Sequence, residues 1–187
     1  MNERRQKLIE AYNSNKIRGV ELLLDNVHDL HNVAAVSRSA DALGIRTVHL
    51  YYTYNECPNM QSEGHKASAS ANQWIQYQPV ENLTEFIQLK KSQSFKVYGA
   101  AKQEGASDAS ALQFSKKSLI MMGSEQYGLS PELREVVDEF VFIPMVGMVE
   151  SYNISVAASI LMYQIFQQRK AELDLNVIDS LRGVRNS

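Results

Sequence analysis

The segment Ile143–Gln164 constrains the fold more than any other part of the chain, because three kinds of local structure follow one another in it without a break. The end of an apolar strand leads through a loop that contains Gly147 into a helix expected over residues 153–170. This helix carries apolar side chains on every side. A helix of that kind must be buried all round, so we expect one of its sides to face a second copy of the chain.

In the rest of the chain, short apolar runs alternate with helical patterns. We expect strands over residues 20–24, 47–52, 74–77, 95–100, 119–122 and 140–143, and helices over residues 3–14, 31–43, 83–89, 130–138 and 153–170. The polar residues 53–71 are expected to form a loop. Apolar strands that alternate with helices are typical of α/β proteins, so we predict a mostly parallel sheet with helices on both faces.

The size of the chain fits one such domain, since it has 187 residues of which 44% are hydrophobic. Its single cysteine, Cys57, excludes an internal disulfide, and the chain does not open on a signal-like segment. Both observations favour a reducing, cytoplasmic setting. The longest apolar run lies within residues 154–166 and is shorter than the roughly 20 residues that a membrane span requires. We therefore expect no association with a membrane.

Charge is distributed unevenly along the chain, although the formal net charge is only −2. Residues 1–18 contain five basic and two acidic side chains, a local charge of +3. This basic helical arm is expected to grip a phosphate backbone, with Arg4, Arg5, Lys7 and Arg18 as the candidate RNA-binding residues. The alternative interpretation of the same pattern is a solvated amphipathic terminal helix.

Several common kinds of site are missing from the sequence. It contains no G-x-G-x-x-G, no Walker A and no G-x-S-x-G pattern, and its four histidines have no metal-ligand spacing with Cys57. We therefore predict no metal site. What remains are the strand ends at Ala100, Gly123 and Ile143, and ligands of open α/β sheets bind beyond the carboxyl ends of strands.

Three motifs lie at or near these positions. They are N-x-x-A-x-x-R over Asn32–Arg38, G-x-E-x-x-G-L over Gly123–Leu129, and IPMVGMVESYNISVA from Ile143. Together they resemble the SpoU/TrmH family of RNA ribose 2′-O-methyltransferases, within the SPOUT superfamily. The G-M-V-x-S step in the third motif is similar to the branch that methylates guanosine 18 in the D-loop of tRNA. Tyr152 stands where that family usually has leucine.

The resemblance implies an α/β fold with a C-terminal trefoil knot, an S-adenosylmethionine cofactor, a homodimer and a tRNA substrate. The domains expected from it are a basic arm over residues 1–18, the methyltransferase domain over 19–170 and a tail over 171–187. The residues that match the family's catalytic positions are Arg38, Asn32, Glu125, Ser151 and Asn153. The residues expected to touch the cofactor are Ala100, Gly123, Ile143, Met145, Gly147 and Tyr152. Arg38 is expected to contact RNA as well.

The role of Arg38 has two interpretations. The family proposal makes it the base that takes the 2′-hydroxyl proton, whereas a guanidinium, which stays charged, is better suited to stabilising a developing alkoxide. The function also has alternatives: methylation of ribosomal RNA or another tRNA nucleotide, and RNA binding without catalysis on the same fold. A flavodoxin-like small-molecule binder would explain the strand and helix alternation but none of the three motifs.

Overall fold

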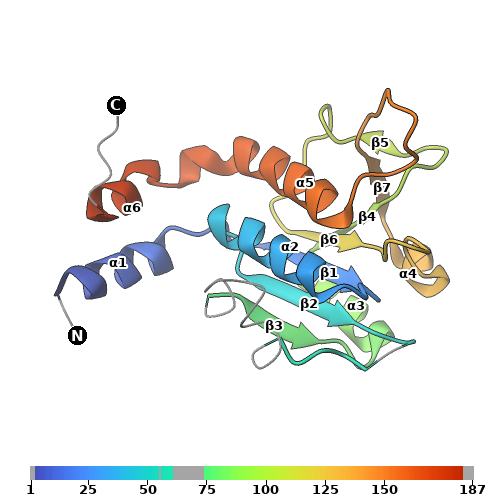
Figure 1. The fold of residues 1–187 in the computed structure, drawn as a ribbon, viewed down its shortest axis with the longest axis horizontal. Coiled ribbons are helices and arrows are strands. Elements are labelled where there is room, and N and C mark those ends of the chain that lie inside the picture. The colour runs from blue at the N-terminus through green and yellow to red at the C-terminus, as the bar shows by residue number, and fades with distance from the viewer. Residues whose placement is uncertain (1–2, 55, 61–73, 183–187) are drawn as a thin grey trace.

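The computed structural model describes residues 3–54, 56–60 and 74–182. Across these residues seven strands form one sheet in the order β3-β2-β1-β6-β4-β7-β5, and every strand pair is parallel (Figure 1). The strands are β1 (Val20–Asp25), β2 (Thr47–Tyr51), β3 (Gln76–Pro79), β4 (Lys96–Ala100), β5 (Ser107–Asp108), β6 (Ser118–Met122) and β7 (Glu139–Phe142). The predicted parallel α/β fold is confirmed.

Helices cover both faces of this sheet, as predicted. They are α1 (Glu3–Ser14), α2 (Leu30–Ala42), α3 (Leu83–Ser92), α4 (Pro131–Val136), α5 (Ile154–Arg169) and α6 (Leu175–Arg182), with a short 3-10 turn, η2 (Lys170–Glu172), after α5. Helices α2 and α5 pack on one face, and α3 and α4 on the other (Figure 1). None of the helices in the described ranges is long and apolar enough to cross a membrane.

The aliphatic run of β1 shows why the sheet has two covered faces. Leu22 and Leu24 belong to the core beside α2 and α5, whereas Leu23 belongs to the core beside α3 and α4. All three side chains are fully buried. Successive side chains of a strand point to opposite faces, so three consecutive buried leucines need a helix layer on each side of the sheet.

Most elements begin and end within one residue of the expected positions, whereas β3, α3 and α4 differ by two or three residues. Helix α3 was expected to end at residue 89 but extends to Ser92. The third strand begins at Gln76, two residues later than expected, because Trp74 lies in a turn. Helix α4 ends at Val136 and does not reach Asp138. The Asp138 carboxylate accepts a hydrogen bond from the backbone N–H of Val97 at 2.8 Å, and its own N–H donates to the Val97 carbonyl at 2.9 Å. Asp138 therefore joins the sheet.

The first and last helices, α1 and α6, lie side by side at one end of the molecule (Figure 1). Helix α1 spans the predicted residues 3–14 and contacts α6. Asn15 holds the two together through its amide, which donates to the Asp174 carbonyl at 2.9 Å and accepts from the Asp174 N–H at 3.0 Å. The expected loop over residues 53–71 lies largely in residues 55 and 61–73, outside the described ranges. The trefoil knot stays a prediction.

Candidate active site

A cavity of about 510 Å³ lies at the carboxyl ends of β4, β6 and β7, against the start of α5. The register of the sheet brings these strand ends together, because Ala100 pairs with Met122 on one side and with Val141 on the other. Five of the six residues predicted to touch the cofactor line this cavity: Ala100, Gly123, Ile143, Met145 and Tyr152. The sixth, Gly147, does not line it.

The wall below the cavity is a tight turn that begins at Gly123. Ser124 and Gly128 form an antiparallel bridge with two backbone hydrogen bonds of 3.0 Å. A Cβ atom on Gly123 would lie 2.0 Å from the carbonyl carbon of Gly128 and 2.1 Å from the nitrogen of Leu129. Residue 123 must therefore be glycine, because only the absence of a side chain lets the two backbones approach so closely.

The loop from Ile143 to Asn153 forms the outer rim of the cavity and is mostly exposed. Val146 and Met148 are fully exposed, and the Tyr152 hydroxyl donates a 3.4 Å hydrogen bond to the Pro144 carbonyl. Apolar side chains gathered on an exposed loop are typical of a surface that covers a ligand or a partner. Ser151 also lies in this rim and lines the cavity.

A chain of hydrogen bonds connects the three motif regions. The amide nitrogen of Asn32 donates to the Glu125 carboxylate at 2.5 Å, and its amide oxygen accepts from the amide nitrogen of Asn153 at 3.1 Å. Asn153 caps α5 by accepting from the backbone N–H of Ser155 at 2.9 Å and from its hydroxyl at 2.6 Å. Three residues separated by 93 and 121 positions in the sequence are thereby held in one array.

A second cavity, of about 740 Å³, lies on the other side of this array. Ser124 and Glu125 line both cavities, whereas Asn32 lines only the second. The second cavity also contains the rings of Tyr54 and Tyr127, which are 65% and 74% exposed and therefore free to stack on a planar ligand. Two ligands bound in the two cavities would meet at Glu125.

The floor between the cavities depends on two polar residues that the sequence analysis did not assign to the site, Asp25 and Asn26. The Asp25 carboxylate accepts from the backbone N–H of Ser130 at 2.6 Å and from the Asn26 amide at 2.7 Å, while burial raises its pKa. The Asn26 amide oxygen accepts from the backbone N–H of Thr53 at 2.8 Å. These bonds join the loops after β1, β2 and β6. The available signal was a pair of polar residues directly after three consecutive leucines.

Arg38 is the one predicted catalytic residue that lines neither cavity. It lies exposed on α2, and in the described part of the chain its guanidinium has no hydrogen bond or ion pair. Six residues separate it from Asn32, which on a helix of 3.6 residues per turn places the two side chains about 120° apart. One helix cannot direct both into the same cavity.

The predicted RNA-binding residues do not gather in one patch either. Lys7 pairs with Glu3 at 2.7 Å on the exposed surface of α1, and Arg5 lines a groove between α1 and the ends of α5 and α6. Arg4 is exposed on the same helix. Arg18 lines a neighbouring pocket at the amino ends of the strands, which shares Tyr12, Arg46 and Trp74 with the groove of Arg5. Over the described residues, no cluster of three or more His, Cys, Asp or Glu side chains is suited to a metal ion.

The fold and the site together define a class of protein: a parallel α/β domain with two adjoining ligand cavities beyond the carboxyl ends of its strands. Residues 19–163 match the model of the SpoU rRNA Methylase family, and the chain therefore belongs to that family. A tRNA (guanosine(18)-2′-O)-methyltransferase of Thermus thermophilus is 30% identical over 167 residues, which are 89% of this chain and 84% of the relative. The enzyme of the same name from Escherichia coli K12 is 31% identical over 79% of this chain and 62% of its own length.

Solved structures of the family have the same fold. The Aquifex aeolicus TrmH/SpoU tRNA modifying enzyme superposes with a TM-score of 0.76 over 97% of this chain and 95% of its own, at 22% identity. An rRNA methyltransferase of Sinorhizobium meliloti with bound AdoMet superposes with a TM-score of 0.71 over 86% of this chain and 59% of its own, at 25% identity. The resemblance drawn from the three motifs is confirmed, and the flavodoxin-like alternative is removed.

Proposed function

We propose that this protein transfers a methyl group from S-adenosylmethionine to a ribose 2′-hydroxyl of tRNA, at guanosine 18 of the D-loop. The observation that carries the proposal is the pair of cavities that meet at Glu125, because a group transfer needs donor and acceptor sites with a common wall. The names of the relatives from Thermus thermophilus and Escherichia coli support guanosine 18 as the target.

The cavity bounded by Ala100, Gly123 and Ile143 suits S-adenosylmethionine. Its volume of about 510 Å³ lies in the usual range of roughly 300 to 1,000 Å³ for small-molecule sites. Its floor consists of apolar side chains and strand-end backbone, which suits an adenosine, and the carboxylates of Glu125 and Glu150 favour a cation. When bound, the cofactor supplies an electrophilic methyl group on a sulfonium. Met145, Tyr152 and Gly147 are proposed to close over it.

The second cavity is proposed to hold the target nucleotide. The exposed rings of Tyr54 and Tyr127 offer stacking surfaces for an unpaired base, which is how proteins commonly read single-stranded RNA. Asn32 is fixed between Glu125 and Asn153 and is proposed to hold the ribose in line with the donor. Ser151 is proposed to order the rim at the same point.

Arg38 is proposed to act on a neighbouring copy in a homodimer. It lies between Ala35 and Ala42 on α2, residues that line an apolar groove of about 510 Å³ together with Val156 and Tyr163 of α5. Val156 and Tyr163 are 46% and 50% exposed, so a second copy would bury them. A homodimer across this groove would carry Arg38 to the edge of an active site. There its charge stabilises the developing alkoxide, since a guanidinium stays protonated at neutral pH.

The remaining expectations belong to the same proposal. The family match over residues 19–163 supports a methyltransferase domain over 19–170, with a basic arm over 1–18 and a tail over 171–187. The C-terminal trefoil knot and the cytoplasmic setting are proposed on the same family basis.

A second candidate is methylation of ribosomal RNA, which is favoured by the description of the matching family and by the rRNA methyltransferase of Sinorhizobium meliloti. The decisive experiment is methyl transfer from labelled S-adenosylmethionine to unmodified tRNA transcript, with the product mapped by mass spectrometry. Label at guanosine 18 that disappears when this guanosine is replaced supports the proposal. Transfer to ribosomal RNA alone would support the second candidate, and cofactor binding without transfer to either RNA would point to an RNA-binding protein without catalysis.

A further inference from the structure

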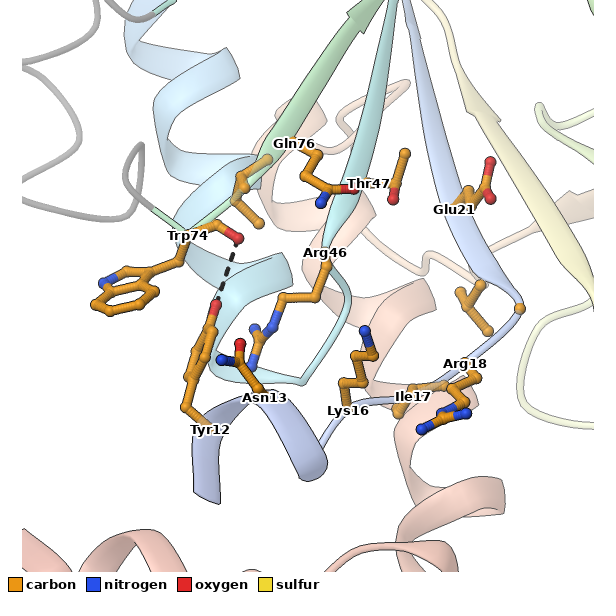
Figure 2. A pocket seen from close by; sticks show the side chains of 13 residues that line it. Tyr12, Asn13, Lys16, Ile17, Arg18, Glu21, Arg46, Thr47, Trp74 and Gln76 are labelled. Carbon is orange, nitrogen blue, oxygen red and sulfur yellow. Dashed lines mark hydrogen bonds between the residues drawn. The ribbon is translucent and has the colours of Figure 1, made fainter. Parts of the chain in front are cut away.

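A pocket of about 530 Å³ lies at the amino ends of β1, β2 and β3, next to the end of α1 (Figure 2). We name this the amino-edge pocket and define it by six of its lining residues: Tyr12, Lys16, Arg18, Glu21, Arg46 and Trp74. The active site lies at the other end of the strands. Because β1 has 6 residues and a strand rises about 3.3 Å per residue, the two sites lie about 20 Å apart.

The amino-edge pocket carries an excess of positive charge. Three cations and one carboxylate line it, a formal sum of +2. The carboxylate of Glu21 is already engaged, because it accepts from His49 at 2.6 Å and from Lys90. Lys16 and Arg18 are exposed, and their side chains have no ion pair or hydrogen bond among the described residues. The pocket can therefore accept an anion without first breaking an ion pair of Lys16 or Arg18.

Arg46 gives the pocket a fixed donor. Its terminal nitrogen donates to the Asp41 carbonyl at 2.8 Å and to the Asp41 carboxylate at 2.9 Å, and its guanidinium lies 3.6 Å from the centre of the Tyr12 ring. With the guanidinium held in this way, its Nε is buried and has no hydrogen-bond partner within the described ranges. A buried donor without a partner is destabilising.

Aromatic rings form one side of the pocket. Tyr12 and Trp74 pack with their ring centres 4.7 Å apart. The Tyr12 hydroxyl donates to the Asp41 carboxylate at 2.7 Å and lies 3.4 Å from the Trp74 carbonyl (Figure 2). Figure 2 shows the Lys16 amine and the Arg46 guanidinium on the same side of the pocket, with Arg18 further along its rim. Cations beside aromatic rings are typical of surfaces that bind nucleic acid backbones.

We propose that the amino-edge pocket binds a phosphate of the substrate RNA, as a second point of contact about 20 Å from the methyl-transfer site. The proposal rests on the proposed function, because it assigns the ligand to the same RNA. Lys16 and Arg18 extend from the pocket into solvent, which suits a ligand that continues beyond it, as an RNA backbone does and a free phosphate does not. An RNA backbone and free phosphate would both present a phosphate group to the pocket, and the experiment below distinguishes between them.

Trp74 makes the pocket directly observable, because it is the only tryptophan in the chain. Its emission is titrated with unmodified tRNA transcript in one arm and with inorganic phosphate in the other. Binding of labelled tRNA is measured independently by fluorescence anisotropy. We expect a saturable change in Trp74 emission at the tRNA concentrations that give binding by anisotropy, and little change with phosphate at equal concentration.

The variant for the test is Lys16→Ala combined with Arg18→Ala, at two exposed positions where truncation leaves the fold intact. Loss of two phosphate contacts should weaken tRNA binding by about tenfold and reduce the slope of log K against log salt by roughly 1 to 2. The control is Lys91→Ala on α3, which removes one positive charge and its ion pair with Asp138 outside the pocket. We expect the control to bind tRNA within about twofold of the parent protein.

Four outcomes are possible. Weaker binding by the double variant with a tRNA-dependent change in emission supports the pocket. Unchanged binding and salt slope overturn it, even if methyl transfer to tRNA is intact. A response of Trp74 to inorganic phosphate alone, without an effect of the double variant on tRNA binding, also overturns it in favour of a small-anion site. Binding at the pocket without any methyl transfer supports the pocket and contradicts the proposed function, so the two failures are distinguishable.

Discussion

Replacement of Gly123 by alanine is the perturbation whose consequence follows most directly from the structure. The added Cβ would lie 2.0 Å from the Gly128 carbonyl carbon, where an ordinary contact is at least 3.4 Å, so the turn would have to move by about 1.4 Å (3.4 − 2.0). The clashing atoms belong to the backbone, and no side chain can rotate away. The movement would break the bridge between Ser124 and Gly128.

The expected size of the effect combines two costs. Two backbone hydrogen bonds contribute about 1 kcal/mol each, and forcing extra volume into a packed site costs about 1 to 3 kcal/mol. The free energy of unfolding of Gly123→Ala should therefore fall by about 3 to 5 kcal/mol. If the protein folds with the turn displaced, affinity for S-adenosylmethionine should fall by about 100-fold, because the turn is a wall of the cofactor cavity.

Urea unfolding measures the stability term, and isothermal titration with S-adenosylmethionine measures the affinity. Gly147→Ala is the matched control, because a Cβ at position 147 would meet no atom within 4 Å. Gly147→Ala controls for the stability measurement, and we expect it to unfold like the parent protein. If Gly147→Ala loses affinity for S-adenosylmethionine while its stability is unchanged, that result would support the predicted contact between Gly147 and the cofactor. Unfolding within about 0.5 kcal/mol of the parent and unchanged affinity in Gly123→Ala would refute the reasoning.

Three further predictions concern the active site, the dimer and the core. Arg38→Ala should lower the rate of methyl transfer by about 100-fold or more while cofactor binding stays constant. Arg38→Lys should keep part of the rate if the positive charge of the side chain is what matters. Near-normal turnover in Arg38→Ala would exclude Arg38 both as the base and as the group that stabilises the alkoxide. Val156→Asp should convert a dimer into a monomer in light scattering, and an unchanged mass would place the dimer interface elsewhere. Burial lowers the pKa of His49. Burial alone would raise the pKa of Glu21, but the hydrogen bonds from His49 and Lys90 outweigh it, so the pKa of Glu21 is lowered as well. The folded protein then binds fewer protons than the unfolded chain, so its stability should fall as the pH drops below 6.5 and again below 4.5. The midpoint of urea unfolding against pH measures this, and His49→Gln should flatten the first decrease.

Much of the fold could be predicted from sequence because β1, β4 and β6 contain runs of buried apolar residues and the helices have clear ends. The strand β5 was missed, since Ser107 and Asp108 are polar and too few to show a pattern. Helix α4 was predicted two residues too long, because the carboxylate of Asp138 bonds to Val97, 41 residues away. Contacts at that range leave no trace in local periodicity.

In the candidate site, too, some features could be predicted from the sequence and others depend on contacts between distant residues. The resemblance of the three motifs to the SpoU/TrmH family led to the six expected cofactor residues, and the structure places five of them in the lining of the cavity. The direct bond between Asn32 and Glu125 could not be predicted, because 93 residues separate them. Spacing along a helix could have shown that Asn32 and Arg38 face different ways, about 120° apart. The bond between Asp25 and Ser130 depends on the pairing of β1 with β6 and needed the fold itself.

The pairing of β1 with β6 also has a consequence for folding while the chain is being synthesised on the ribosome. Val20 of β1 pairs with Ser118 of β6, 98 residues later in the chain (118 − 20). At a synthesis rate of about 5 to 20 residues per second, β6 is completed roughly 5 to 20 seconds after β1, and one edge of β1 stays unpaired during that time. During that interval Leu22, Leu23 and Leu24 lack β6 beside them. The nascent chain is therefore most prone to aggregation before β6 emerges, and slower translation of residues 26–117 would lengthen that exposure.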